Sequence, residues 1–270
     1  ESGDVARLAS KDASAERILP PRIGPYEVVR EIGRGGMGAV YQALDPRLGR
    51  RVALKGITGV LAGLSDTAAE RFRREARATA RLRHGAIVPV HELLEVDGQA
   101  WLVLDYVEGT TLTEHLRGAG ADPAAVAKLL LPVVQALAFA HRQGVVHRDL
   151  KPDNVLVDGQ GRPYLTDFGL AHIAGEADER RITEDGALLG TPQYMAPEQA
   201  RGELDRIGPR TDVYGFGAIL YEALAGRPPF EFASLMVLLE RVALEPVVAP
   251  TLLRPDVPRG TVPTVRTRTA

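Results

Sequence analysis

A glycine-rich segment between two apolar runs constrains the fold of this chain more than any other feature. Residues Gly33 to Gly38 read Gly-Arg-Gly-Gly-Met-Gly, and an alternating run, Ala-Val-Tyr-Gln-Ala, follows them. A dinucleotide-binding turn with this glycine pattern would lead into a helix, and a Walker loop needs a lysine where Ala39 stands. The alternation instead predicts a second strand, so the glycines form the tip of a β-hairpin. Glycine at this tip lets backbone N–H groups approach a phosphate without a Cβ in the way.

The spacing of apolar residues divides the chain into two lobes. Residues 26–106 carry short alternating runs separated by turns, which predict strands, with one helix from about Asp66 to Arg83. Residues 107–260 are mainly helical in pattern, with one hairpin between Val155 and Thr166. We therefore expect an α+β fold in which a small antiparallel sheet lobe with one major helix precedes a larger, mainly helical lobe.

Both ends of the chain lack this patterning. Residues 1–25 have little apolar periodicity and end in three prolines, so we expect a flexible segment there. A helix is expected to end near Leu244, and the chain after it is rich in proline. We expect an irregular tail over residues 261–270.

Composition narrows the classes of function. The chain has 33 Lys and Arg against 35 Asp and Glu, so no basic footprint predicts nucleic-acid binding. It has no cysteine, which excludes disulfide scaffolds, thiol catalysis and cysteine-ligated zinc. The most apolar stretch, Ala124 to Ala140, falls short of the about 20 residues that cross a bilayer, so we expect no membrane segment. The expected location is the cytoplasm, either alone or as the cytosolic part of a larger, membrane-anchored protein.

The strand Val-Ala-Leu-Lys at 52–55 is the next candidate for ligand binding. A period of two puts Ala53 and Lys55 on one face, where Ala53 leaves room for a flat base and the Lys55 ammonium meets phosphate. The alternative is a strand lysine whose ammonium reaches solvent. On the expected helix, Glu75 either holds this ammonium or belongs to a solvated charged face.

The densest polar stretch, His-Arg-Asp-Leu-Lys-Pro-Asp-Asn at 147–154, predicts a loop at the end of packed elements. In the hairpin that follows, we place residues 154 and 165 opposite each other, which brings Asn154 and Asp167 to the same open end. An amide and a carboxylate oxygen, with phosphate and water oxygens, form a ligand set that Mg²⁺ prefers. Asp149 lies beside them in this arrangement, free to accept a proton.

Several motifs occur together in an order that resembles the protein kinases. They are GRGGMGAVY, VALK, HRDLKPDN, the DFG at Asp167 to Gly169, and GTPQYMAPE ending at Glu198. The joint match is highly specific and covers roughly Tyr26 to Gly260. The GGMG loop, FRREA and MAPEQARGE look most like bacterial Ser/Thr kinases of the eukaryotic-like type. Lys151, which follows the expected catalytic aspartate, favours Ser/Thr over Tyr specificity.

The resemblance implies an ATP- and Mg²⁺-dependent protein serine/threonine kinase and gives the motif residues roles. Lys55 holds the α- and β-phosphates and pairs with Glu75, under a lid shaped by Gly33, Gly35 and Gly38. Asp149 accepts or orients the proton of the substrate hydroxyl, and Lys151 neutralises the moving phosphoryl group. Asn154 and Asp167 hold Mg²⁺. The loop is braced by His147 and, from the core of the large lobe, by Asp212.

The same resemblance implies an adenine site between the lobes. The residues expected to surround the base are Ile32, Val40, Ala53 and Leu156, with Leu104 as gatekeeper and backbone hydrogen bonds from Asp105 and Val107. The implied partners are protein substrates with serine or threonine, and a second copy of the kinase for autophosphorylation in trans.

Regulation is expected in the polar segment between the DFG and Glu198. Thr183 is the candidate phosphosite, and its phosphate would pair with Arg148. In the alternative, Glu184 and Asp185 already supply part of that charge. We expect Thr191 to shape the substrate groove.

One departure from the family concerns the residues after 244, where the two terminal helices of a kinase domain are not found in the pattern. Glu198 would then lack its usual arginine partner, and breaking such a buried pair can cost about 3–5 kcal/mol. Two other functions therefore stay open. The first is a catalytically silent, ATP-binding or scaffold module with a kinase fold. The second is a small-molecule kinase, which the GTPQYMAPE segment disfavours.

Overall fold

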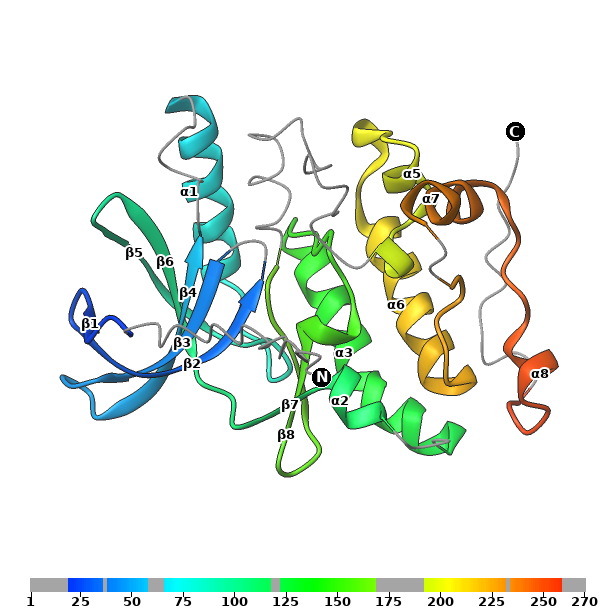
Figure 1. The fold of residues 1–270 in the computed structure, drawn as a ribbon, viewed down its shortest axis with the longest axis horizontal. Coiled ribbons are helices and arrows are strands. Elements are labelled where there is room, and N and C mark those ends of the chain that lie inside the picture. The colour runs from blue at the N-terminus through cyan, green and yellow to red at the C-terminus, as the bar shows by residue number, and fades with distance from the viewer. Residues whose placement is uncertain are drawn as a thin grey trace, which may run out of the picture.

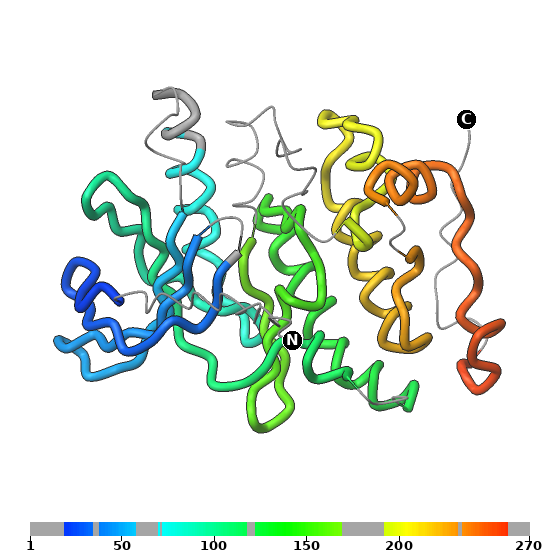
Figure 2. Tube along the Cα trace, in the orientation of Figure 1, coloured from blue at the N-terminus to red at the C-terminus, as the bar shows by residue number. Residues whose placement is uncertain are grey.

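The computed structural model describes residues 19–35, 38–57, 66–117, 122–168, 192–231 and 234–258. They form two lobes, with a sheet at the left of Figure 1 and helices at the right. The colour sequence in Figure 2 shows that the N-terminal part of the chain builds the sheet lobe and the later part builds the helical lobe. The α+β architecture expected from the sequence is confirmed.

A six-stranded antiparallel sheet forms the small lobe, in the order β1-β2-β3-β4-β6-β5. Its strands are β1 (Arg22–Ile23), β2 (Tyr26–Gly35), β3 (Gly38–Asp45), β4 (Arg50–Ile57), β5 (Val90–Val96) and β6 (Gln99–Asp105). Gly35 pairs with Gly38 at the tip of the β2–β3 hairpin. The described residues on either side of this tip are therefore antiparallel strands, as the sequence context predicts.

The folded region begins before the expected boundary at residue 26. Arg22 and Ile23 pair with Glu27 and Tyr26, and Ile23 is buried in an apolar cluster that also holds Trp101. The end of the segment predicted to be flexible is thus part of the sheet. Prolines near this strand did not exclude pairing, because a two-residue edge strand needs few backbone donors.

Helix α1 (Asp66–Ala80) packs on the sheet through one apolar stripe. Phe72 and Ala76, one turn apart, are buried in a cluster with residues of β5 and β6. The helix ends three residues earlier than Arg83, the predicted end. Arg83 instead donates from Nη1 to the carbonyl oxygen of Ala80 at 2.8 Å, and so caps the last turn.

The large lobe consists of helices and a short three-stranded sheet, in the order β7-β8-β9. Its helices are α2 (Leu112–Leu116), α3 (Pro123–Arg142), α5 (Pro197–Ala200), α6 (Pro209–Ala225), α7 (Leu235–Leu244) and α8 (Pro250–Leu253). Its strands are β7 (Gly109–Thr111), β8 (Val155–Asp158) and β9 (Pro163–Leu165). Four of these helices begin with proline, whose missing N–H is no loss in a first turn.

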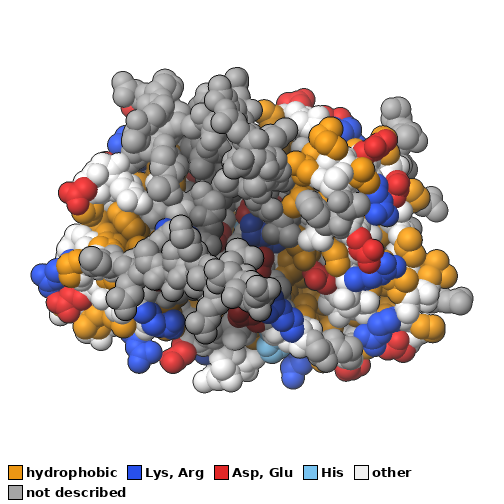
Figure 3. Space-filling model, in the orientation of Figure 1, with side chains coloured by type: hydrophobic (Ala, Val, Ile, Leu, Met, Phe, Trp, Pro, Cys, Tyr) orange, Lys and Arg blue, Asp and Glu red, His pale blue; other side chains and the backbone are white. Residues whose placement is uncertain are grey.

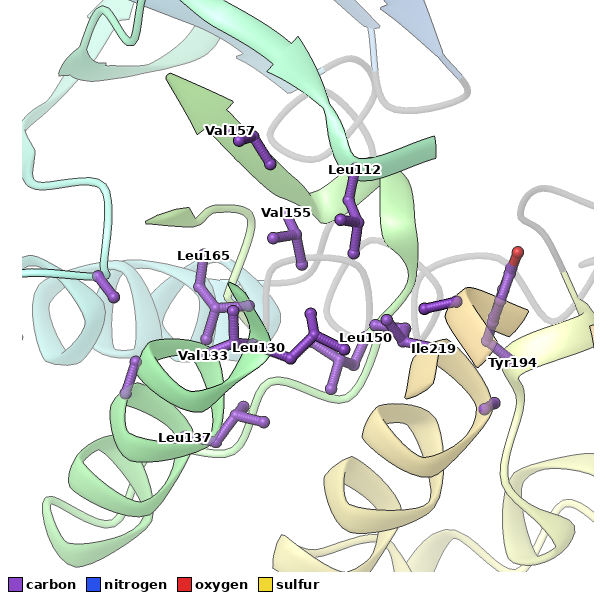
Figure 4. Close-up of a cluster of buried hydrophobic side chains, with 14 of the residues drawn as sticks. Leu112, Leu130, Val133, Leu137, Leu150, Val155, Val157, Leu165, Tyr194 and Ile219 are labelled. Carbon is purple, nitrogen blue, oxygen red and sulfur yellow. The ribbon is translucent and has the colours of Figure 1, made fainter. Parts of the chain in front are cut away.

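The core of the large lobe anchors the polar loop at 147–154 (Figure 4). Leu130 and Val133 of α3 lie close to Leu150 of the loop, which is near Ile219 of α6, and all four belong to one buried cluster. Leu150 is 4% exposed, and burying a leucine contributes about 1.5–3 kcal/mol. A single apolar side chain thus ties the polar loop to both long helices.

Helix α3 is, within the described ranges, the one helix long and apolar enough to cross a membrane. It spans 20 residues, so the argument that its apolar stretch is too short to cross a bilayer does not hold. Its face with Val126, Leu130 and Val133 is buried in the lobe, and core helices of compact domains pass the same test of length and composition. We therefore interpret α3 as a core helix.

The proline-rich segment after α7 is more ordered than its pattern predicts. It forms the short helix α8, and Val257 is 2% exposed in the core of the large lobe. Arg254 donates from Nη1 to the carbonyl oxygen of Leu224 in α6 at 3.1 Å. Two side chains thus attach this segment to the lobe.

Candidate active site

A buried carboxylate on α6 holds the polar loop in place. Asp212 is 1% exposed, and its two oxygens accept the backbone N–H groups of His147 and Arg148, each at 2.8 Å. The Nε2 of His141, on α3, lies 2.7 Å from the same carboxylate. Asp212 braces the loop as the resemblance implied. His141 was not singled out from the sequence, because its spacing from other polar residues carries no motif signal.

His147 connects this loop to the strand that precedes Asp167. Its Nε2 lies 2.9 Å from the carbonyl oxygen of Thr166, and its ring centroid is 4.7 Å from that of Phe168. Both rings are buried. The bracing role expected for His147 agrees with these contacts, which also fix the residues on either side of Asp167.

Asp149, Lys151 and Asn154 form a single hydrogen-bonded group. Lys151 Nζ lies 2.8 Å from Oδ2 of Asp149, and Asn154 donates from Nδ2 to the same oxygen at 3.1 Å. Asn154 also donates to the carbonyl oxygen of Asp149 at 2.7 Å. Within the described part of the chain, Oδ1 of Asp149 accepts no hydrogen bond. The amide nitrogen of Asn154 thus faces Asp149, and its side-chain oxygen is the atom left to bind a cation.

The β8–β9 hairpin has a register one residue different from the predicted one. Val155, and not Asn154, lies opposite Leu165, while Thr166 donates its backbone N–H to the carbonyl oxygen of Asn154 at 3.0 Å. The turn contains Gly161 in the left-handed region at φ 75°, and its odd number of residues causes the shift. Asn154 and Asp167 still emerge at the same end of the hairpin, because Asp167 follows Thr166 directly.

Lys55 forms its ion pair with Asp167. The Nζ to Oδ2 distance is 2.7 Å, and the two side chains are 14% and 23% exposed. Burial alone would raise the pKa of Asp167, but the Lys55 ammonium and its hydrogen bond hold that pKa below its usual value. Asp167 and Arg148 each have a φ of 66°, uncommon for residues other than glycine, and such backbone strain clusters at functional sites.

The predicted pair between Lys55 and Glu75 is not formed in this structure. Glu75 instead accepts two hydrogen bonds from Nη1 of Arg148, at 2.9 and 3.1 Å. Arg148 was assigned to a phosphate on Thr183, and here it meets the helix carboxylate. Spacing along the chain places Glu75 on the correct helix, but which of two cations it contacts depends on how that helix packs between the lobes.

Four of the residues expected around adenine lie in one apolar cluster, and two others lie on strands β2 and β3. Ala53 and Leu104 are cross-strand partners, and both belong to one apolar cluster with Val107 and Leu156. Val40 lies opposite Lys55 on the neighbouring strand. Ile32 lies at an irregularity of β2, between the paired residues Glu31 and Gly33.

Some of the predicted site residues lie outside the described part of the chain. They are Gly169, Thr183 and Thr191. The described residues contain no group of three or more His, Cys, Asp or Glu that could hold a metal ion. The predicted Mg²⁺ ligands are one carboxylate and one amide, so the remaining oxygens of such a site would have to come from phosphates and water.

Glu198 lies at the start of α5 and contacts α6. Its Oε1 accepts a hydrogen bond from the Thr211 hydroxyl at 2.7 Å, and within the described ranges it forms no ion pair. The nearby Tyr214 hydroxyl is buried with no hydrogen-bond partner among the described residues, and burial together with the Glu198 charge raises the pKa of Tyr214 to about 12. In the described part of the chain, the partner of Glu198 is therefore the Thr211 hydroxyl and not an arginine.

The charged surface agrees with the near-neutral composition. On the face shown in Figure 3, Lys and Arg side chains are interspersed with Asp and Glu over the described part of the surface. They do not gather into one large basic area in this view.

Comparison with known proteins matches the fold and the motifs to one family. The protein kinase domain family matches residues 26–245. A probable serine/threonine-protein kinase of Streptomyces coelicolor is 40% identical over 244 residues, which are 88% of this chain and 36% of that protein. The serine/threonine-protein kinase PknH of Mycobacterium tuberculosis is 39% identical, over 92% of this chain and 39% of its own length.

A solved structure agrees with these matches. The crystal structure of the PknI kinase domain of Mycobacterium tuberculosis has a TM-score of 0.67 and 31% identity, and the match covers 87% of this chain and 84% of that one. The chain belongs to the protein kinase family, and the relatives it matches are bacterial serine/threonine kinases. It spans less than half the length of these curated relatives.

Proposed function

We propose that this domain transfers the γ-phosphate of ATP to serine and threonine hydroxyls of proteins, with Mg²⁺. The observation that carries the proposal is the group formed by Asp149, Lys151 and Asn154 on a loop that Asp212 fixes from the core. Phosphoryl transfer needs little covalent chemistry from a protein. It depends on in-line positioning and on charge stabilisation, which fixed cations and carboxylates supply.

Asp149 is the residue placed to receive a proton. Its Oδ2 is occupied by Lys151 and Asn154, while Oδ1 accepts no bond within the described ranges. We infer that Oδ1 accepts the proton of the substrate hydroxyl as the hydroxyl oxygen bonds to the γ-phosphorus, while the bond from the γ-phosphorus to the β–γ bridging oxygen breaks and ADP leaves. The Lys151 ammonium, 2.8 Å from Oδ2, offsets negative charge next to the transferred group.

The residues present fit a nucleotide and a metal ion. The apolar walls at Ala53, Leu104 and Leu156 suit a flat base. A Cβ at Gly33 would meet no atom within 4 Å, so the fold itself does not require glycine there and the open space suits a phosphate. Asn154 and Asp167 would hold Mg²⁺, which neutralises charge on the phosphate oxygens when bound.

The ion pairs of this structure would exchange in a catalytic arrangement. Lys55 contacts Asp167, and Glu75 contacts Arg148. We infer that Lys55 turns to Glu75 and to phosphate, which frees Asp167 for Mg²⁺ and Arg148 for a phosphate on Thr183. We also propose that a second copy of the kinase phosphorylates Thr183 in trans. The domain would act in the cytoplasm, where ATP and Mg²⁺ are plentiful.

The second candidate is a catalytically silent, ATP-binding module. The pair between Glu75 and Arg148 favours it, because the expected partner of Lys55 is engaged elsewhere. Both candidates bind nucleotide, so binding alone does not separate them.

Labelled ATP and Mg²⁺ separate the two candidates. The wild-type chain and Asp149→Asn are incubated with γ-labelled ATP and a generic protein substrate, and mass spectrometry locates any phosphate. The proposal predicts labelled serine or threonine with the wild type, and a rate lower by about 10²–10⁴ with the variant. ATP binding without transfer by the wild type would support the silent module instead.

A further inference from the structure

Residues 105–108 join the two lobes, and three side chains of this segment contact strands of the small lobe. Asp105 meets His91 of β5, with 2.6 Å between Oδ1 and Nε2. The Tyr106 hydroxyl accepts a hydrogen bond from Nη2 of Arg30 at 3.0 Å. The carboxylate of Glu108 lies 3.5 Å from Nη1 of Arg51. All three small-lobe partners lie on strands of the six-stranded sheet.

These three contacts differ in strength. Arg51 and Glu108 are 58% and 82% exposed, and an ion pair this open to water contributes little. The bond from Arg30 reaches a neutral phenol at an exposed site. His91 is only 21% exposed and makes the shortest contact of the three, with a carboxylate. The pair of His91 and Asp105 is therefore the main polar attachment.

The geometry around His91 defines its role. A separation of 2.6 Å from a carboxylate oxygen requires a hydrogen on Nε2, so His91 is the donor. The Arg50 guanidinium lies beside this pair. Its Nη1 is 3.0 Å from Nε2 of His91 and 4.0 Å from Oδ1 of Asp105, and its Nε is 3.8 Å from Oδ2 of Asp45. The backbone N–H of Asp105 donates to the carbonyl oxygen of Pro89 at 3.0 Å. Asp105 is thus held at both its main chain and its side chain by residues 89–91.

A cavity behind this segment makes the polar attachment more important. It has a volume of about 540 Å³ and lies between residues 105–108 and the turn at 158–164. Asp105 and Val107 line it, whereas Val40, Ala53, Leu104 and Leu156 do not. Val107 packs in one apolar cluster with Leu156 and Tyr164 of the large lobe, but the rest of the segment borders this open space, so its position depends largely on contacts with the small lobe.

We propose that His91 is a positioning residue for nucleotide binding. Through Asp105 it fixes the backbone of residues 105–107, where the resemblance to protein kinases implies hydrogen bonds with the adenine of the nucleotide that the proposed function requires. The inference rests on that assignment. His91 does not touch the nucleotide, so its loss weakens binding of the base without changing the chemistry at Asp149.

The test measures ADP affinity by calorimetry for four proteins: wild type, His91→Leu, His91→Gln and His115→Leu. Leucine removes the donor, glutamine keeps an N–H near the position of Nε2, and His115 is an exposed histidine on α2 that serves as a matched control. We expect His91→Leu to bind ADP about fivefold more weakly, with His91→Gln and His115→Leu within about twofold of wild type. In phosphate transfer, KM for ATP rises by the same factor in His91→Leu, while kcat does not change.

The outcomes separate this inference from the proposed function. If the wild type does not bind ADP, the proposed function fails. If the wild type binds and His91→Leu binds equally well, or if His91→Gln is as weak as His91→Leu, the positioning role is contradicted. Should His91→Leu not fold, as judged by its melting curve without nucleotide, Asp105→Ala tests the same bond by removing its acceptor, and an ADP affinity equal to wild type overturns the inference.

Discussion

The polar loop at 147–154, which we propose as the catalytic loop, and helix α1 both present charged side chains to the candidate site, but they are held in different ways. The loop is fixed by Asp212, a carboxylate that is 1% exposed and accepts two backbone N–H groups. Glu75 of α1 is held by Arg148 alone within the described ranges, in an ion pair whose side chains are 26% and 30% exposed. The buried contacts cannot be lost without leaving unpaired polar groups, whereas the half-exposed pair exchanges partners at low cost.

This difference locates the part of the site that can change. The residues that we propose for proton transfer are already assembled, because Asp149, Lys151 and Asn154 bond to one another on a braced loop. The lysine that we propose for phosphate binding, Lys55, is paired with Asp167 instead. We therefore expect a switch in this domain to act on α1 and on the ion pairs of Lys55 and Arg148.

The largest effect is expected from removing the brace. Asp212→Ala leaves two buried backbone N–H groups and the His141 ring without their acceptor, so the free energy of unfolding falls by about 3–5 kcal/mol. Urea unfolding measures this change, with Asp205→Ala, an exposed aspartate on the same lobe, as the control. A loss below about 1 kcal/mol would show that the loop does not depend on Asp212.

A smaller effect, with a defined pH dependence, is expected at the turn of the β8–β9 hairpin. Backbone and side-chain hydrogen bonds from Arg162 and the backbone N–H of Gln160 outweigh the effect of burial and lower the pKa of Asp158 from 3.8 to about 2. Because the folded pKa is the lower one, the stabilisation is fully present above about pH 4 and is lost as the pH falls toward about 2. Asp158→Asn should therefore be less stable than wild type near neutral pH, and the difference should shrink in acid.

Urea midpoints at about pH 7 and about pH 3 measure this effect. Asp122→Asn, which changes an exposed helix cap away from the hairpin, is the control. A difference between wild type and Asp158→Asn that stays constant over this range would contradict the assignment of the low pKa to Asp158.

The smallest effect on folding is expected at the exchangeable pair. Glu75→Gln removes a partly exposed ion pair with Arg148, so the free energy of unfolding changes by only about 0.2–1 kcal/mol. The rate of phosphate transfer falls by about tenfold or more, because Lys55 loses the partner that the proposed catalytic arrangement needs. Glu70→Gln, at an exposed position of the same helix, should change neither quantity. Full activity of Glu75→Gln would contradict the proposed exchange.

The sequence predicted those parts of the molecule that depend on local pattern. Alternation after the glycines identified the β2–β3 hairpin, and the apolar spacing identified α1 and the mainly helical character of the large lobe. Family motifs placed Asp149, Lys151 and Asn154 on one loop, where the structure brings them into hydrogen-bond contact. Such features arise from neighbours in the chain, and a single sequence shows them directly.

Features that depend on packing between distant segments were not predicted. The partner of Glu75 is set by how α1 sits between the lobes, and periodicity along the helix carries no information on that. The register of the β8–β9 hairpin depends on whether the turn has one residue more or fewer. Gly161 allows the longer turn, but the residues around it do not predict it. His141 and His91 act through residues 71 and 14 positions away, and no short motif records such contacts.

The most direct test of the account is a crystal structure of this chain with Mg²⁺ and a non-hydrolysable ATP analogue. The account predicts that Glu75 leaves Arg148 and forms an ion pair with Lys55, while the hydrogen bonds from His147 and Arg148 to Asp212 keep their present lengths. A complex in which the catalytic loop has rearranged and Glu75 still pairs with Arg148 would contradict it.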